Sequence, residues 1–376
     1  MEDEILFPGA TIGIIGESPN GIMLEQAAHK LGFDVIAYGP NEEAPTLRGA
    51  DVKVVGTYTD QAKLQDFAQR CSLVTYESET IPAQTIAYLS RFTKLPQGSE
   101  TLEIVQDRLL ERTFFEQSNL NIAPYATIVN LDDVYQAISS IGYPAILKPI
   151  QKGFSKKIVI KKQTDIAKCA DIIDHGTFIL ESMIPYQKEL AVTMSKDKNG
   201  DIKFYPLVEA EYRQGKLHQV LAPAQVDSDV ANEIRRLSEL VVKQVKSVGV
   251  MTLSFFLTET GALYVKRLVT GVNSLGYVFS RAANVDIFEQ HLRVLANMPL
   301  AQPELIQATG MVMIEQDKRE ALRTQWLLKT NWHYQFYRYP KSMTTLNWGH
   351  VLVTGESSQA IKEQVAATGI WDKLEE

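Results

Sequence analysis

A lysine-rich loop follows an apolar run near the middle of the chain. The stretch "YPAILKPIQKGFSKK" places Lys148 at the end of a predicted strand, and a loop that contains Gly153 and Lys157 comes after it. A lysine at a strand end beside a glycine-containing loop is one way in which proteins bind nucleotide phosphates. A solvated lysine-rich loop has the same composition, and the single glycine slightly favours this second interpretation when the stretch is taken alone.

Two acidic residues flank a short connection further along. In "FILESMIPYQKELAV", Glu181 ends a predicted strand and Glu189 precedes the next one. The residues between them, including Ile184, could flank an adenine ring while a carboxylate binds ribose hydroxyls. An ordinary strand–turn–strand with surface acids explains the pattern as well, so this stretch alone is weak evidence for a nucleotide site.

The first predicted strand runs into a glycine-containing turn before a helix. "GIIGESPNGIML" places Gly16 and Gly21 at this junction, where the N–H groups of a helix N-terminus can bind a phosphate. The glycine spacing is not that of the dinucleotide-binding fingerprint, and Glu17 would repel a phosphate. A tight strand-to-helix turn without a ligand carries about half of the weight for a motif this loose.

A predicted hairpin carries unexpected charges. "MTLSFFLTETGALYVKRLVTGVNSLGY" reads as two strands joined by a turn at residues 258–261, with Ser254 on the first strand and Lys266 and Arg267 near the end of the second. Neither a hydroxyl nor a cation is a usual metal ligand. The histidines and the two cysteines, Cys71 and Cys169, also lack metal-ligand spacing. The sequence therefore predicts buried free thiols and no metal site.

Bulk composition restricts the class of protein. The chain has 376 residues, 45% of them hydrophobic and 22% charged, which indicates two or three globular domains. The net charge of −7 argues against non-specific nucleic-acid binding, and no apolar run reaches the roughly 18 residues that would indicate a membrane span. The acidic N-terminus lacks the basic start of a signal peptide, so we expect a cytoplasmic protein.

Strand-like and helix-like segments alternate over roughly residues 10–95, which predicts a doubly wound parallel sheet. "ETLEIVQDRLLERTFFEQSNL" then predicts one long helix. The following residues, up to about 296, mix strands with one long helix and predict an α+β segment with antiparallel strands. The tail after Pro303 predicts a small module of strands and a final helix.

The order of these signals resembles the 5-(carboxyamino)imidazole ribonucleotide synthases, which are ATP-grasp enzymes of purine biosynthesis. The resemblance spans roughly residues 10–300 and, less clearly, the tail. Its motifs are "LGFDVIAYGPNEEAP", "ADVKVVGTYTD", "VTYESETIPA", "IVQDRLLERTFF", "IAPYATI", "GYPAILK", "ILESMIPYQKELAV", "YPLVEAEYRQGKL", "APA", "GVMTLSFFLTETGALYV" and "FEQHLR".

The resemblance implies a three-part fold. The parts are a doubly wound pre-ATP-grasp domain at residues 1–96, an ATP-grasp domain of two lobes at 97–300, and a small β-rich domain at 301–376. It also implies a homodimer and a small-molecule nucleotide ligand.

The resemblance also implies roles for individual residues. The family's ATP contacts fall on Arg108, Lys148, Gly153, Lys157, Glu181, Ile184 and Glu189. Its substrate contacts fall on Gly16, Gly21, Glu77, Glu79 and Glu209. The implied reaction uses ATP to phosphorylate bicarbonate, and the resulting carboxyphosphate carboxylates the amine of aminoimidazole ribonucleotide, which yields ADP and phosphate.

The chain departs from the family where the chemistry is expected. The family's magnesium carboxylates and a neighbouring arginine fall on Ser254, Lys266, Arg267 and Gly271 here, and Mg²⁺ needs oxygen ligands. The phosphate loop "KGFSKKIVI" has lost most of its glycines, and Leu346 and Asn347 replace a basic pair.

Three hypotheses stay open from the sequence. The chain is an active ligase of this family, or it is an inactive or repurposed paralogue, or it is a structural subunit that binds neither ligand. In the second case it would bind a nucleotide without Mg²⁺, use Lys266 and Arg267 as counter-charges, and act as a sensor or partner-binding protein. The replaced residues favour the second hypothesis by about two to one.

Overall fold

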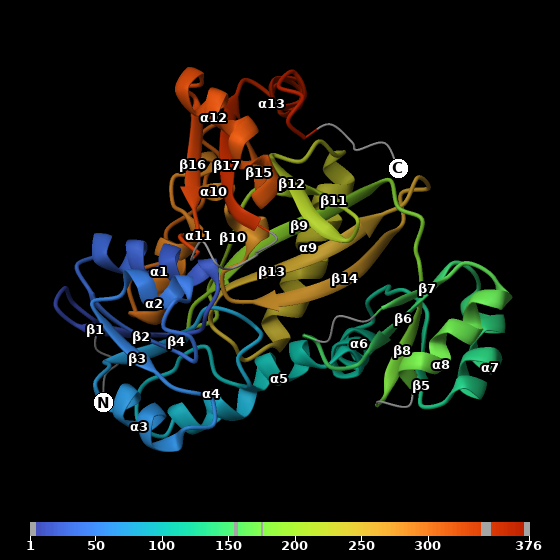
Figure 1. Cartoon of the computed structure of the whole chain (residues 1–376), viewed down its shortest axis with the longest axis horizontal. Helices are drawn as coiled ribbons and strands as arrows, with labels where there is room; N and C mark the ends of the chain where they lie inside the picture. The colour runs from blue at the N-terminus through green and yellow to red at the C-terminus, as the bar shows by residue number, and fades with distance from the viewer. Residues whose placement is uncertain (1–4, 154–156, 174–175, 340–346, 372–376) are drawn as a thin grey trace.

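The N-terminal part is built on a parallel sheet with the strand order β3-β2-β1-β4 (Figure 1). The computed structural model describes residues 5–153, 157–173, 176–339 and 347–371. Helices cover both faces of this sheet, as the alternating pattern predicts. The elements in chain order are β1 Thr11–Ile15, α1 Pro19–Lys30, β2 Asp34–Gly39, α2 Pro45–Gly49, β3 Val52–Val55, α3 Gln61–Gln69, β4 Leu73–Tyr76 and α4 Ala83–Leu89.

The prediction of one long helix after this sheet is wrong, because the segment forms two helices. α5 is Glu100–Gln106 and α6 is Arg108–Gln117, and Asp107 between them has extended backbone angles. The Asp107 carboxylate accepts hydrogen bonds from the N–H groups of Leu109 and Leu110 and so caps α6. The Arg108 N–H donates to the Ile150 carbonyl, so a tertiary contact fixes the break.

A small antiparallel sheet with the order β5-β8-β6-β7 follows. In Figure 1 it lies with its helices at the opposite end of the molecule from the N-terminal sheet. Its elements are β5 Tyr125–Ile128, α7 Leu131–Ile141, β6 Ala145–Pro149, β7 Ile158–Ile160, the 3₁₀ helix η1 Gln163–Cys169, α8 Ala170–Ile173 and β8 Phe178–Ser182.

The strands after β8 form one large sheet with the order β14-β13-β9-β11-β12-β15-β17-β16, and β10 pairs with β9. The predicted C-terminal strands do not make a sheet of their own, because β15 pairs with β12. This sheet's elements are β9 Lys188–Lys196, β10 Ile202–Phe204, β11 Val208–Arg213, β12 Lys216–Ala222, α9 Ser228–Gln244, β13 Gly249–Leu257 and β14 Leu263–Thr270. They continue as η2 Ser274–Gly276, α10 Phe279–Ala282, α11 Ile287–Leu295, β15 Ala308–Glu315, η3 Gln316–Lys318, α12 Arg319–Leu328, β16 Trp332–Phe336, β17 Asn347–Gly355 and α13 Ser358–Ala366.

The hairpin β13–β14 forms as predicted and contains a bulge. Ser254 pairs with Arg267 and Phe255 pairs with Val265, so Lys266 is the extra residue on β14. A bulge re-aims the side chains around it. Here it lets the side chains of both Lys266 and Arg267 reach acidic partners.

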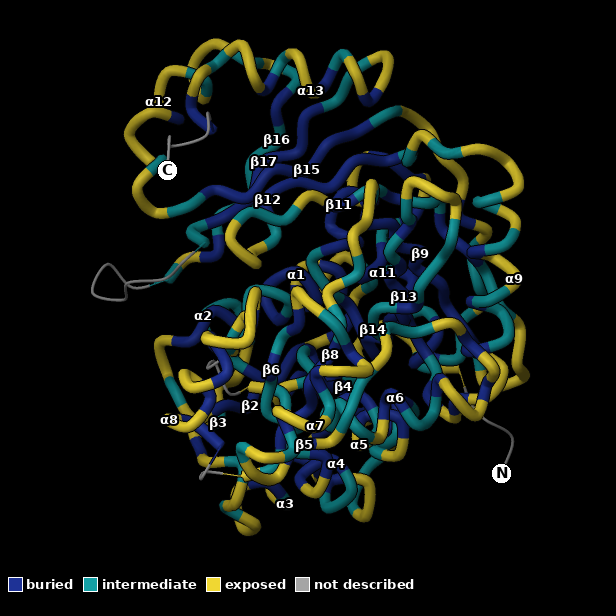
Figure 2. Tube along the Cα trace, turned by 90° about the vertical axis from the view of Figure 1, so that its right-hand side faces the viewer, coloured by how far each residue is buried: buried dark blue, intermediate teal, exposed yellow. Residues whose placement is uncertain are grey.

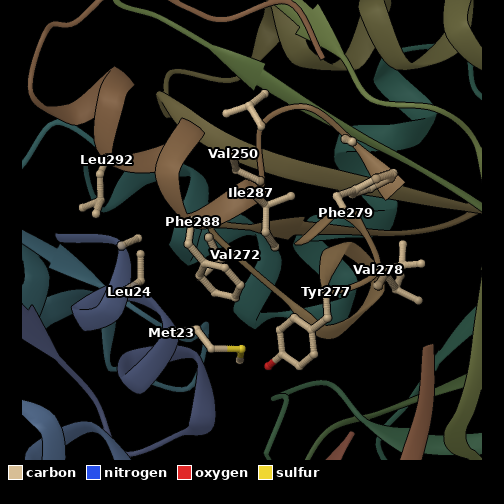
Figure 3. Close-up of a cluster of buried hydrophobic side chains, with 14 of the residues drawn as sticks. Met23, Leu24, Val250, Val272, Tyr277, Val278, Phe279, Ile287, Phe288 and Leu292 are labelled. Atoms are coloured by element: carbon tan, nitrogen blue, oxygen red, sulfur yellow. The ribbon is translucent and has the colours of Figure 1, made fainter. Parts of the chain in front are cut away.

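Buried residues follow the strands of the large sheet, and exposed residues dominate α12 and α3 (Figure 2). One apolar cluster joins the N-terminal sheet to the large one. Met23 and Leu24 of α1 face Phe288 and Leu292 of α11, with Tyr277 beside them (Figure 3). Both cysteines are buried free thiols, as the sequence predicts. No helix among the described residues is long and apolar enough to cross a membrane.

Candidate functional site

The Glu181 carboxylate lies between two cations where the small sheet meets α6. Its Oε1 accepts from Arg112 Nε at 2.6 Å, and its Oε2 forms a short ion pair with Lys148. Glu181 is on β8 and Lys148 on the neighbouring β6, so the sheet register fixes their approach. Burial alone would raise the pKa of Glu181, but the charges of Lys148 and Arg112 outweigh it and lower that pKa to about 2.

Arg108 lies at the first turn of α6 and is held by backbone carbonyls. Its Nη1 donates to the carbonyls of Pro149 at 2.5 Å and Gln151 at 3.1 Å. Burial lowers the pKa of Lys157, and the positive charges of Lys148, Arg108 and Arg267 near it lower that pKa further. Arg108 and Lys157 thus add positive charge next to the pair of Lys148 and Glu181.

The predicted phosphate loop is described only in part. Gly153 has a φ of +99°, in the left-handed region that favours glycine, and a Cβ at this position would meet nothing within 4 Å. Residues 154–156 lie outside the described residues.

The connection between β8 and β9 presents an aromatic surface. Ile184 in this connection is half-buried, and Tyr186 is 45% exposed. The Tyr186 ring stacks on Phe256 of β13 with 4.5 Å between centroids. A flat ring system beside these residues would find both an aromatic contact and a partly apolar wall.

The Glu189 carboxylate pairs with Lys266 in a short contact across the sheet. The ammonium of Lys266 also lies 4.3 Å from the centroid of the Tyr212 ring and 5.2 Å from that of Phe256. Burial raises the pKa of Glu189 and lowers the pKa of Lys266, so it opposes the ion pair that keeps both groups charged.

Arg267 forms a short ion pair with Glu79, which comes from the N-terminal part of the chain. The negative charge of Glu79 raises the pKa of Arg267. Ser254, opposite Arg267, is 1% exposed, and within the described part of the chain its Oγ has no hydrogen-bond partner. Gly271 has a φ of +83°, a conformation in which the arginine of the family would be strained.

These positions do not fit a magnesium ion. Lys266 and Arg267 are cations, which cannot ligate Mg²⁺, and each pairs with an acid that could otherwise serve as a ligand. Among residues 5–153, 157–173, 176–339 and 347–371, no group of three or more His, Cys, Asp or Glu side chains is arranged to hold a metal.

A cavity of about 520 Å³ is lined by Arg267 and Glu79 together with residues of the C-terminal strands. Its described lining residues are Ser18, Pro19, Asn20, Ser78, Glu79, Tyr212, Arg267, Val269, Thr270, Val272, Asn273, Ser274, Leu275, Tyr277, Met313, Tyr337, Tyr339 and Asn347. We call it the interdomain cavity.

The candidate substrate residues separate into different places. Glu79 lines the interdomain cavity, whereas Glu77 lies behind the turn after β1 and accepts from the N–H groups of Glu17 and Ser18, both at 2.9 Å. Gly16 leaves room for the Glu77 carboxylate, because a Cβ would lie 2.0 Å from its Oε1. Gly21 is buried against Thr46 instead, where a Cβ would lie 2.1 Å from the hydroxyl oxygen, so close packing of α1 and α2 requires this glycine.

Glu209 is not brought to this site. On β11 it lies opposite Leu190, whereas Glu189 lies opposite Ala210, so the carboxylates of Glu209 and Glu189 face opposite sides of the sheet. Glu209 pairs with Lys188 at 2.9 Å and Lys362 at 3.3 Å.

Sequence reasoning missed another buried acid of this site and its partners. Glu111, which is 1% exposed, accepts from Lys152 Nζ at 3.2 Å and from the Leu268 N–H at 3.0 Å. Arg112 was missed as well. A signal existed, because Arg112 follows Arg108 by four residues and therefore lies on the same side of α6.

Two family models match the chain. One, the ribonucleotide synthetase preATP-grasp domain, covers residues 9–106, and the other, the ATP-grasp domain, covers residues 113–288. A Bacillus subtilis N5-carboxyaminoimidazole ribonucleotide synthase is 31% identical over 320 residues, which are 85% of this chain and 84% of that protein. A Staphylococcus aureus protein of the same name is 26% identical over 95% of this chain and 96% of its own.

Solved structures of such proteins share the fold. An ADP complex of N5-carboxyaminoimidazole ribonucleotide synthetase has a TM-score of 0.94 with 27% identity, over 99% of both chains. The Staphylococcus aureus synthetase complexed with ADP has a TM-score of 0.92 with 26% identity, over 97% of this chain and 98% of its own. The chain therefore belongs to the N5-carboxyaminoimidazole ribonucleotide synthase family of ATP-grasp proteins.

Proposed function

We propose that this chain binds ATP or ADP between its small antiparallel sheet and its large sheet. The side chains that we assign to the nucleotide form a charged cluster. Its cations are Arg108, Arg112, Lys148, Lys152, Lys157, Lys266 and Arg267, and its carboxylates are Glu79, Glu111, Glu181 and Glu189. Similar structures solved with ADP support the assignment.

The charge balance of this cluster is the observation that carries the proposal. Seven cations face four carboxylates, so the cluster has an excess of three positive charges. Grouped positive charges in a partly buried site attract a multivalent anion, and a nucleotide polyphosphate supplies one. In this proposal the base and ribose are bound beside Glu181 and Ile184, with the exposed ring of Tyr186 near by.

We further propose that this nucleotide binds without magnesium. Ser254, Lys266 and Arg267 offer no set of oxygen ligands, and the cations of the charged cluster, which outnumber its carboxylates, would provide the positive charge that a metal would bring to the phosphates. The chain would then act as a nucleotide sensor or a partner-binding protein rather than as a ligase.

The family reaction is the other candidate. The relatives are named for the synthesis of N5-carboxyaminoimidazole ribonucleotide, and the match extends over most of the chain. This candidate requires ATP-dependent carboxylation of aminoimidazole ribonucleotide by bicarbonate. The resemblance also supports a cytoplasmic location and a homodimer. Light scattering of the purified chain would test the homodimer.

One pair of measurements separates the two candidates. Calorimetry with ATP and with ADP, each in EDTA and in Mg²⁺, should show binding in EDTA that Mg²⁺ does not strengthen. An assay of ADP release with bicarbonate and aminoimidazole ribonucleotide should show no turnover. Metal-dependent turnover would establish the family reaction instead, and absence of binding under every condition would refute the nucleotide proposal.

A further inference from the structure

Helix α12 and the adjacent strands β16 and β17 form a groove in the C-terminal part of the chain. Arg319, Arg323 and Trp326 follow one another by four and three residues, so they share one side of α12. Tyr334 and Phe336 of β16 are two residues apart and point to the same face of the sheet. The groove has a volume of about 330 Å³, within the range typical of small-molecule sites. We call it the aromatic groove, and its described lining residues are Arg319, Glu320, Leu322, Arg323, Trp326, Tyr334, Phe336 and Trp348.

Four aromatic rings in contact with one another line this groove. The centroid of the Trp326 ring lies 5.3 Å from that of Phe336, with 28° between the ring planes, and 4.8 Å from that of Tyr334. The Phe336 ring in turn lies 4.5 Å from the ring of Trp348. Trp326 is nevertheless 54% exposed, so these contacts leave more than half of its surface free. A planar ring of a ligand can stack on this surface.

The two arginines of the groove are not neutralised by acidic partners. The guanidinium of Arg319 lies 4.6 Å from the centroid of the Trp348 ring, a contact that orients its plane. Within the part of the chain that the structure describes, neither Arg319 nor Arg323 forms an ion pair or donates a side-chain hydrogen bond. Two guanidinium groups with free N–H donors suit a phosphate, which accepts hydrogen bonds from both.

Glu320 is the one acidic side chain among the described lining residues. It is exposed, and among the described residues it has no ion-pair partner. A carboxylate beside a nucleotide commonly accepts hydrogen bonds from ribose hydroxyls. With two guanidinium groups against this single carboxylate, the described lining keeps an excess of positive charge. The groove thus combines a surface for a base, an acceptor for a ribose and cations for a phosphate.

We propose that the aromatic groove binds a nucleoside monophosphate, with its base stacked on Trp326 and its phosphate held by Arg319 and Arg323. The net charge of −7 argues against a long nucleic acid as the ligand. The proposal does not rest on nucleotide binding at the charged cluster, because the described lining of the groove shares no residue with that cluster. In Figure 1, α12 lies at the top of the molecule, away from the small antiparallel sheet at the lower right.

Tryptophan fluorescence of the full-length chain, titrated with adenosine 5′-monophosphate, tests the proposal. All four tryptophans, Trp326, Trp332, Trp348 and Trp371, belong to the C-terminal part of the chain, so their fluorescence reports a base that stacks in the groove. We expect saturable quenching by the monophosphate and about tenfold weaker binding of adenosine, which lacks the phosphate. Absence of saturable quenching, or equal affinity for adenosine, would overturn the proposal. A short oligoadenylate that binds more than about tenfold more tightly than the monophosphate would overturn it too, because it would indicate a nucleic-acid surface.

Substitutions in the groove locate the binding. Arg323→Gln should weaken binding of the monophosphate by about tenfold and leave adenosine binding unchanged, because only the phosphate loses a contact. Trp326→Ala should weaken binding of both ligands by about tenfold, and Trp348 still reports binding in this variant. Arg91→Gln removes an exposed arginine beside the Tyr88 ring in the N-terminal part and should have no effect. Unchanged monophosphate binding in Arg323→Gln, or an equal loss for adenosine, would refute the assignment.

A substitution in the charged cluster separates the two nucleotide proposals. Arg108→Gln should leave the quenching by adenosine 5′-monophosphate unchanged, because Arg108 does not line the aromatic groove. Loss of quenching in this variant would place the monophosphate at the charged cluster and overturn the proposal. Quenching should also persist if calorimetry shows that ATP does not bind at the charged cluster.

Discussion

Lys266 on β14 reaches across β13 to pair with Glu189 on β9. The contact is made because Lys266 is the extra residue of the bulge and its side chain is re-aimed. The ammonium is only 25% exposed and the carboxylate 2% exposed, so neither group is well hydrated. Each of these two charges therefore depends on the other for compensation.

Removal of one member should be more harmful than removal of both. Lys266→Met leaves the Glu189 carboxylate buried without its cation and should lower the free energy of unfolding by about 2–4 kcal/mol. The double variant Lys266→Met with Glu189→Gln should recover much of that loss, because no unpaired charge remains. Urea denaturation of the two single variants and the double variant gives the coupling energy. Losses that simply add would show that the two groups do not interact.

Much of the fold was predictable from local pattern, and the site was not. The parallel sheet and the β13–β14 hairpin are encoded by neighbouring residues, whose apolar periodicity and turn chemistry are visible in sequence. The break at Asp107 was not, because the Arg108 N–H bonds to Ile150, a residue distant in sequence.

The contacts within the charged cluster were likewise not predictable from local sequence pattern. The sequence indicates Lys148 and Glu181 as separate weak signals, and only sheet pairing brings them together. Likewise the partner of Arg267 is Glu79, which lies in another part of the chain. The hydroxyl of Ser254 and the cations of Lys266 and Arg267 were visible in sequence, but the acids that pair with these cations were not.

Glu181 should make stability depend on pH in the acid range. Its folded-state pKa of about 2 lies below the ordinary value of 4.5, so its ionised form stabilises the fold above about pH 4.5. This contribution, about 3 kcal/mol by the size of the shift, should be lost as the pH falls from 4.5 toward 2. Urea unfolding of the wild type and of Glu181→Gln between pH 6 and pH 3 measures it. Parallel curves for the two proteins would contradict the assignment.

Restored carboxylates should create a metal dependence. We expect the triple variant Ser254→Glu, Lys266→Asn and Arg267→Glu to bind Mg²⁺ with ATP more tightly than it binds ATP alone, because two carboxylates and an amide oxygen then face the phosphates. Calorimetry in EDTA and in Mg²⁺ gives the ratio of the two affinities. The exposed substitution Lys216→Glu controls for general loss of positive charge. If the triple variant gains no Mg²⁺ effect, our placement of the metal position is wrong.

Arg108 should act on nucleotide binding with little effect on stability. Its guanidinium is anchored to the carbonyls of Pro149 and Gln151 and forms no ion pair within the described part of the chain, so Arg108→Gln removes one positive charge from the cluster without leaving an unpaired acid. We expect the affinity for ATP to fall by about tenfold, the order of one charge-assisted contact. The matched variant Arg236→Gln removes an exposed arginine on α9, which pairs with Glu233 at 2.8 Å, and should leave the affinity unchanged. Calorimetry with ATP gives the affinities, and thermal unfolding without nucleotide checks that both proteins remain folded. Equal ATP affinity in the two variants would show that the nucleotide does not bind at the charged cluster.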